Sequence, residues 1–155
     1  MAFTESALVR WDPGASVDLL SYIALPGDLR EVEEASAYDE RMAAIARFWK
    51  QHDPTPGTPE NEIRSEFYRR VRVADNAFAH MRQPGWRTDR GIVYVKHGEP
   101  DELDDHPFNI DRHPYQVWHY YRGGRYLQFV FVDENEDGDY RLSYPFNGLF
   151  MTPDF

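Results

Sequence analysis

A short segment with glycine at both ends divides this chain into two halves of different character. The segment spans residues 85–91 and reads GWRTDRG. Apolar residues before it recur at three- and four-residue steps, which is typical of amphipathic helices. The residues after it form short apolar runs between turn residues, which is typical of strands. We therefore expect an α+β fold in which this segment joins a helical half to a sheet half.

The helical half is expected to be a hairpin of two long helices. The spacing of Asp28 and Glu31 matches a capping box, so the first helix is predicted to run from there to about Gln51. Thr58 followed by a proline predicts the start of the second helix. Because the connector between them is short, we expect the two helices to be antiparallel.

The sheet half is expected to be an antiparallel meander. Gly123 and Gly124 predict a two-residue hairpin turn, since both positions of such a turn favour positive φ. The segment Asp101–Pro114 is acidic and lacks periodicity, so we expect a loop there. The expected strands are Ile92–His97, Tyr115–Tyr121, Tyr126–Asp133 and Tyr140–Tyr144, with a further short strand at Leu8–Trp11.

The predicted fold is a single α+β domain that covers residues 1–155. In it, two long antiparallel helices pack on one face of an antiparallel β-meander of three or four strands. The expected segments are an irregular lead-in (1–21), the helical hairpin (22–83), the antiparallel sheet (84–144) and a tail (145–155).

Charge and composition argue against several classes of function. The 17 basic and 27 acidic residues give a net charge of −10, so a nucleic-acid partner, which needs clustered positive charge, is not expected. No apolar run reaches the roughly 18 residues of a membrane span. There is no cysteine for a disulfide or a thiolate metal site. No signal peptide opens the chain, but export would remove one, so composition leaves the compartment open.

Ordered motifs along the chain resemble the GWxTD domain family. Residues 85–89 carry the motif for which the family is named, and FW at residues 48–49 followed by DPTPGT at residues 53–58 resembles its helix connector. Similar motifs follow as far as residue 142. The function of the family is uncharacterised, and its members resemble exported bacterial proteins. The resemblance therefore implies a module of the bacterial periplasm or cell envelope, and it carries no catalytic residue over to this chain.

Residues within these motifs are the candidate binding residues. The short polar side chains at positions 88 and 89 are suited to bonding free backbone N–H groups at a turn. A polar clasp that locks a helix to a strand explains such residues, and a ligand-binding corner is the alternative. The candidates are Trp86, Thr88, Asp89, Arg90, Asn61, Glu62 and Arg70.

The acidic, histidine-bearing stretch 97–113 is the candidate metal site. Carboxylates together with imidazoles suit a divalent transition metal, whereas carboxylates alone suit a hard cation. No fixed ligand spacing is present, and a solvated acidic loop explains the same residues. A divalent cation is the one cofactor considered, and its candidate ligands are His97, Glu99, Asp101, His106 and His113.

Aromatic residues beyond those required by the helix stripes indicate a binding surface. Aromatic anchors are common in interfaces, although a small domain also uses aromatic side chains as core. An open edge strand of the meander would accept a partner strand. The residues concerned are Trp11, Tyr68, Phe108, Tyr115, Tyr121, Tyr126, Tyr144, Phe146, Phe150 and Phe155.

We therefore expect a non-catalytic protein-interaction or ligand-binding module. The sequence indicates neither the identity of its protein partner or small ligand nor its oligomeric state. The alternative is a metal-dependent or carboxylate-based enzyme that uses residues 97–113. No nucleophile elbow, phosphate-cradling glycine loop or Ser/His/Asp order supports that alternative.

Overall fold

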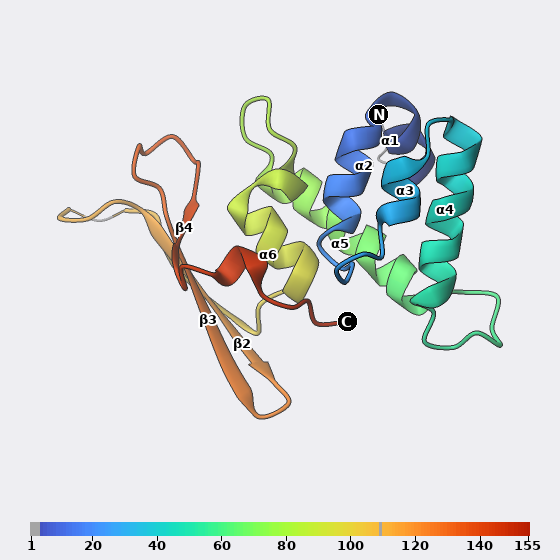
Figure 1. The fold of residues 1–155 in the computed structure, drawn as a ribbon. Coiled ribbons are helices and arrows are strands. Elements are labelled where there is room, and N and C mark those ends of the chain that lie inside the picture. The colour runs from blue at the N-terminus through green and yellow to red at the C-terminus, as the bar shows by residue number, and fades with distance from the viewer. Residues whose placement is uncertain (1–3, 109) are drawn as a thin grey trace. The chain divides into compact units, whose positions relative to one another are not determined.

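The computed structural model of the chain describes residues 4–108 and 110–155 and has an α+β fold (Figure 1). Within these residues it contains six α-helices and one four-stranded antiparallel sheet. The chain divides into two compact units, residues 1–69 with Phe155 and residues 70–154. The boundary between the units falls within helix α5 (Glu62–Phe78).

Helices fill the first unit, including the stretch expected to be irregular. Thr4 and Asp12 each accept a hydrogen bond from a backbone N–H of the helix that follows, and Pro13 occupies a first-turn position where no N–H is needed. The predicted strand at Leu8–Trp11 is therefore wrong, because these caps begin helices on both sides of the turn. The helices are α1 (Glu5–Trp11), α2 (Pro13–Leu20), α3 (Arg30–Glu34), α4 (Tyr38–Gln51) and the first part of α5.

The expectation of two long helices is not confirmed. The predicted first helix is interrupted at residues 35–37, and Glu40 accepts a hydrogen bond from the N–H of Ala37 (3.3 Å) where α4 begins. Helix α5 begins at Glu62 and not at Thr58, because Asn61 accepts a hydrogen bond from the N–H of Arg64 (2.9 Å). Local caps thus divide the apolar stripe into shorter helices than its periodicity indicates.

An acidic side chain organises the core of the first unit. The carboxylate of Glu5 accepts hydrogen bonds from Trp49 Nε1 (2.8 Å), the Tyr68 hydroxyl (2.6 Å) and the Arg64 guanidinium (2.5 Å). Burial and the Glu5 charge raise the pKa of Tyr68 well above its usual value. The ring of Phe155 lies 6.1 Å from that of Phe67.

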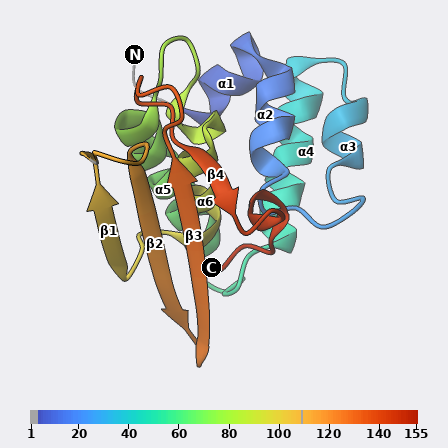
Figure 2. The ribbon, with the colours of Figure 1, turned by 90° about the vertical axis from the view of Figure 1, so that its left-hand side faces the viewer.

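The sheet of the second unit is an antiparallel meander with the strand order β1-β2-β3-β4 (Figure 2). Gly123 and Gly124 have φ values of 53° and 76°, as the predicted hairpin turn requires. The segment Asp101–Pro114 is not wholly a loop: β1 lies within it as an edge strand whose side chains are all exposed. The strands are β1 (Glu102–His106), β2 (Tyr115–Arg122), β3 (Arg125–Val132) and β4 (Arg141–Tyr144).

Residues Ile92–His97 belong to a helix, so the strand predicted there is wrong. Helix α6 (Asp89–His97) begins where Thr88 Oγ1 accepts a hydrogen bond from the N–H of Gly91 (3.1 Å). Most of its residues are buried, so its apolar residues follow one another in a short continuous run. A short apolar run of this kind is ambiguous between strand and helix.

Helix α6 lies on one face of the sheet, and Figure 1 shows the sheet nearly edge-on with α6 to one side. The ring of Tyr94 lies 6.4 Å from that of Trp118, and the ring of His97 lies 5.2 Å from that of Phe129. The short 3-10 helices η1 (Gly85–Arg87) and η2 (Gly148–Phe150) also contact α6. Within residues 70–154, the described helices leave the opposite face of the sheet open (Figure 2).

Candidate functional site

The segment at residues 85–91 is a close-packed joint between the end of α5 and the start of α6. A Cβ atom added at Gly85 would lie 2.0 Å from the carbonyl oxygen of Ala74, and one added at Gly91 would lie 1.8 Å from the carbonyl oxygen of Gly85. Trp86 is only 2% exposed. Backbone therefore touches backbone at both glycines, and the tryptophan is core.

The polar residues of the joint satisfy backbone groups. Thr88 Oγ1 donates to the carbonyl oxygen of Gly85 (2.7 Å) while it accepts from the N–H of Gly91. Asp89 Oδ2 accepts a hydrogen bond from the N–H of Leu142 (2.7 Å). Leu142 belongs to β4, where it pairs with Phe131 of β3. These contacts tie α6 to η1 and to the sheet, which is the role of a polar clasp.

Arg90 lies between aromatic rings next to the sheet. Its guanidinium carbon is 4.3 Å from the ring centre of Tyr140 and 5.1 Å from that of Phe78. Its nitrogens donate to Gln116 Oε1 and the carbonyl oxygen of Gly138, both at 3.4 Å. Burial lowers the pKa of Arg90, and the hydroxyl of Tyr140 and nearby aspartates partly offset this.

Asn61 and Glu62 belong to the other unit, where they serve the start of α5. Asn61 Nδ2 donates to the carbonyl oxygen of Trp49 (2.6 Å), and Glu62 accepts a hydrogen bond from the hydroxyl of Thr55 (2.5 Å). This bond lowers the pKa of Glu62, which is exposed. Both residues hold the connector between α4 and α5.

Arg70 anchors the tail of the second unit. Its guanidinium donates to the carbonyl oxygens of Lys96 (3.1 Å) and Asp154 (2.7 Å), near the C-terminal end of α6, where positive charge is favourable. His97 Nδ1 lies 2.7 Å from Asp154 Oδ2. Burial lowers the pKa of His97 more than Asp154 raises it, so the neutral imidazole is favoured.

The candidate metal ligands do not gather in one place. His97 is 1% exposed, whereas Glu99, Asp101, His106 and His113 lie in exposed positions. Hydrogen bonds from the N–H of Tyr121 and from Arg122 lower the pKa of Asp101. In residues 4–108 and 110–155, no group of three or more histidine, aspartate or glutamate side chains could hold a metal ion. The geometry therefore gives no support to a metal centre in this stretch.

The open face of the sheet carries a row of aromatic side chains, which we call the outer face. Directly opposed residues of neighbouring strands point to the same side, so the register places Tyr115, His119, Tyr121, Tyr126 and Tyr144 on this face. Tyr121, Tyr126 and Tyr144 are 57%, 51% and 56% exposed.

Polar contacts fix the aromatic rings of the outer face. His119 Nδ1 lies 2.6 Å from the hydroxyl of Tyr126, and His119 Nε2 lies 3.2 Å from Asp104 Oδ2. The rings of Tyr121 and Tyr126 stack with their centres 5.3 Å apart. The outer face therefore presents aromatic surface in a defined orientation.

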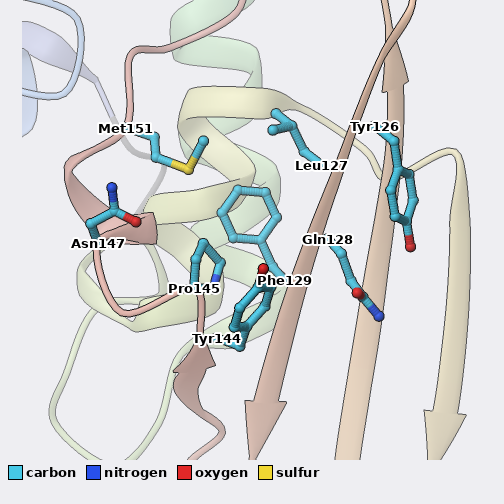
Figure 3. Close-up of a pocket in the computed structure, with 8 residues that line it drawn as sticks. All are labelled: Tyr126, Leu127, Gln128, Phe129, Tyr144, Pro145, Asn147 and Met151. Atoms are coloured by element: carbon cyan, nitrogen blue, oxygen red, sulfur yellow. The ribbon is translucent and has the colours of Figure 1, made fainter.

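A groove of about 270 Å³ adjoins the outer face beside β3 (Figure 3). Four consecutive residues of β3 form one wall, and residues at the end of β4 and in the tail form the other. The lining residues are Tyr126, Leu127, Gln128, Phe129, Tyr144, Pro145, Asn147 and Met151.

Sequence reasoning singled out the aromatic residues but not their arrangement. Of the ten residues considered, Tyr115, Tyr121, Tyr126 and Tyr144 lie together on the outer face. The groove was not predicted. The proline that directly follows the fourth predicted strand was a signal for it, because proline cannot continue the strand ladder and so leaves β4 shorter than β3.

Comparisons with known proteins identify one family. The model of the GWxTD domain matches residues 14–146, which is most of the chain and includes parts of both units. Neither the curated proteins nor the solved structures contain a match. No helix in the described part of the chain combines the length and the apolar character needed to cross a membrane.

Proposed function

Because the chain belongs to the GWxTD domain family, we propose that it is a non-catalytic protein-interaction module whose partner docks on the outer face. The observation that carries this proposal is the set of half-exposed rings at Tyr121, Tyr126 and Tyr144. A sheet face that the helices of its own unit leave open, and that carries several large aromatic side chains, is typical of an interaction surface.

Preorganisation supports binding at this face. Ordering a side chain during association costs about 0.5–1.5 kcal/mol for each rotamer-rich residue. The contacts of Tyr126 with His119 and Tyr121 already restrict its side chain in the free protein, so less side-chain freedom is lost on binding. The joint at residues 85–91 offers no comparable surface, since Trp86 is buried and Asp89 already accepts a hydrogen bond.

Charge indicates the character of the partner. Glu102 and Asp104 of β1 lie on the outer face beside the rings, and the chain as a whole carries −10. A partner surface with apolar side chains and a basic border would complement this arrangement. The proposed location, the periplasm or cell envelope of a bacterium, rests on the family resemblance alone.

A metal-dependent or carboxylate-based enzyme remains the alternative proposal. Its candidate residues at 97–113 include one buried histidine, His97, and exposed side chains that are not grouped with it. The outer face therefore has the stronger support.

Photo-cross-linking in cells that naturally produce this protein tests the proposal. A benzophenone amino acid replaces Tyr121 on the outer face, and in a control protein it replaces Arg47, whose side chain is 58% exposed on the first unit. We expect a discrete adduct from position 121 that the second-site changes Tyr126→Ser and Tyr144→Ser remove. Equal adducts from both positions, or no adduct from position 121, would contradict the proposal.

A further inference from the structure

Strand β3 is longer than the strand that pairs with it on the groove side. Its eight residues pair with β2 along their whole length, but β4 pairs only with Val130, Phe131 and Val132. Beyond Tyr144 the chain turns away at Pro145, which has no N–H with which to continue the ladder. The part of β3 from Tyr126 to Gln128 therefore has an open edge, whereas Phe129 is fully buried.

The register shows which backbone groups this edge presents. Arg122 and Arg125 close the two-residue hairpin, so they form a hydrogen-bonded pair, and such pairs alternate along an antiparallel ladder. The backbone N–H and C=O groups of Leu127 and Phe129 consequently form hydrogen bonds with β2. Those of Tyr126 and Gln128 point toward the groove. In the described part of the chain, no hydrogen bond from another element reaches those backbone groups.

The groove beside this edge is small and lined by side chains of β3, the end of β4 and the tail. Figure 3 shows the side chains of Leu127 and Phe129 turned toward Met151, opposite in direction to those of Tyr126 and Gln128. The volume of about 270 Å³ lies below the ~300 Å³ at which sites for drug-sized ligands begin. The space therefore suits a few side chains on an extended backbone better than a whole small molecule.

We propose that an extended segment of the protein partner adds to β3 as a short antiparallel strand, in line with β4, and fills this groove. The inference rests on the proposed function and names the form of the partner. The partner segment bonds to the free N–H and C=O groups of Tyr126 and Gln128, as in strand addition generally.

The pleat of the sheet fixes the side-chain pattern of the partner segment. The residue opposite Leu127 turns its side chain into the groove, whose lining contains no charged residue, so this position is apolar. Residues opposite Tyr126 and Gln128 turn their side chains to the outer face and point their own N–H groups at β3. The recognised segment therefore alternates apolar and polar residues.

A second copy of this chain is a poorer occupant. Pro145, Asn147 and Met151 form the far wall of the groove, so a segment placed there has chain on both sides. The edge of a second sheet would collide with that wall, whereas a lone extended segment would not.

Two N-methylated peptides test the proposal. The probe is a peptide of alternating valine and threonine with one arginine at each end, in which valine is expected to face the groove. Methylation of the threonine amides removes the donors that face β3, and methylation of the valine amides removes donors that point away. We expect the first change to weaken binding about tenfold or more and the second to leave it nearly unchanged.

Two variants at one position provide a matched check. Gln128→Pro removes the backbone N–H that would donate a hydrogen bond to the partner segment, whereas Gln128→Ala keeps it. Proline is tolerated at this position if the edge of the strand is free. We expect Gln128→Pro to retain the melting temperature of Gln128→Ala but to lose peptide binding. Should Gln128→Pro fail to fold, the methylation contrast on the wild-type protein still decides the matter.

Several results would overturn the inference. They are equal affinity of the two methylated peptides, absence of binding by the unmethylated peptide, and a concentration-dependent dimer whose Gln128 amide is already protected from exchange. If the adduct from position 121 forms while the peptide contrast is absent, the outer face binds its partner without strand addition. If the contrast is present without the adduct, strand addition stands and docking across the outer face fails.

Discussion

The joint at residues 85–91 and the edge of β3 at residues 126–128 differ in how their polar groups are satisfied. At the joint, Thr88 both donates and accepts, and Asp89 accepts from the N–H of Leu142. At the edge, the backbone groups of Tyr126 and Gln128 point into a groove. Trp86, Thr88 and Asp89 of the motif that names the family are therefore part of the internal architecture, and the binding surface that we propose lies outside the motif.

Gly91→Ala is expected to have the largest effect on stability. The new Cβ would lie 1.8 Å from a backbone oxygen, so backbone must shift, and we expect a loss of about 3 kcal/mol in the free energy of unfolding. Gly57→Ala is the matched control, because nothing lies within 4 Å of its added Cβ. Urea denaturation measures both, and equal stabilities for the two variants would show that the joint is not close-packed.

Thr88→Ala is expected to cost about 1–2 kcal/mol of unfolding free energy. It removes the hydroxyl that caps α6 at the N–H of Gly91, and loss of such a cap usually costs this much. Thr88→Ser keeps the hydroxyl and should recover most of the loss in thermal denaturation. Peptide binding at the β3 edge should be the same in both variants; a selective loss of binding in Thr88→Ala would make the joint part of the site.

His97 should make stability depend on pH. Burial lowers its pKa below the usual value of 6.5, so the unfolded state takes up a proton first as pH falls. Its contribution is present above pH 6.5 and is lost as pH falls toward the lowered pKa. Urea denaturation of His97→Asn over this range should give a flatter pH profile, and His113→Gln, at an exposed site, should retain the wild-type profile. Identical profiles for all three proteins would contradict this assignment.

Tyr144→Ser should change the unfolding free energy by no more than about 0.5 kcal/mol, because the side chain is 56% exposed. If the outer face serves recognition, the same change should reduce the adduct from position 121. A large loss of stability with unchanged adduct would assign Tyr144 to the fold instead.

Calcium, zinc or manganese at millimolar concentration should leave the melting temperature unchanged. The structure groups no three potential ligands among the described residues, so no cation would bind the folded state preferentially there. A rise in melting temperature that His106→Gln or His113→Gln abolishes would restore the metal alternative.

Local patterns predicted the parts of the fold that local contacts decide. The hairpin at Gly123–Gly124 and the antiparallel character of the sheet followed from turn residues and alternation. Helix α6 was predicted as a strand, because its short apolar run suits either element and its N-terminal cap lies in a segment that also suits a turn. Strand β1 has the sequence ELDDH, and only its pairing with β2 makes it a strand.

In the candidate site, too, the residues could be predicted from the sequence but their arrangement could not. The aromatic residues of the outer face can be selected from the sequence by excluding those on helix stripes. Their position on one face depends on the register of β2 with β3, which pairs Tyr121 with Tyr126. The open edge depends on a difference in length between two strands, which only their alignment reveals.

Amide hydrogen exchange in the free protein, resolved by residue, tests the contrast between joint and edge most directly. The account predicts slow exchange at Gly85 and Gly91, whose N–H groups donate to Asp75 and Thr88, and fast exchange at Tyr126 and Gln128. Slow exchange at Tyr126 and Gln128 together with fast exchange at the two glycines would contradict it.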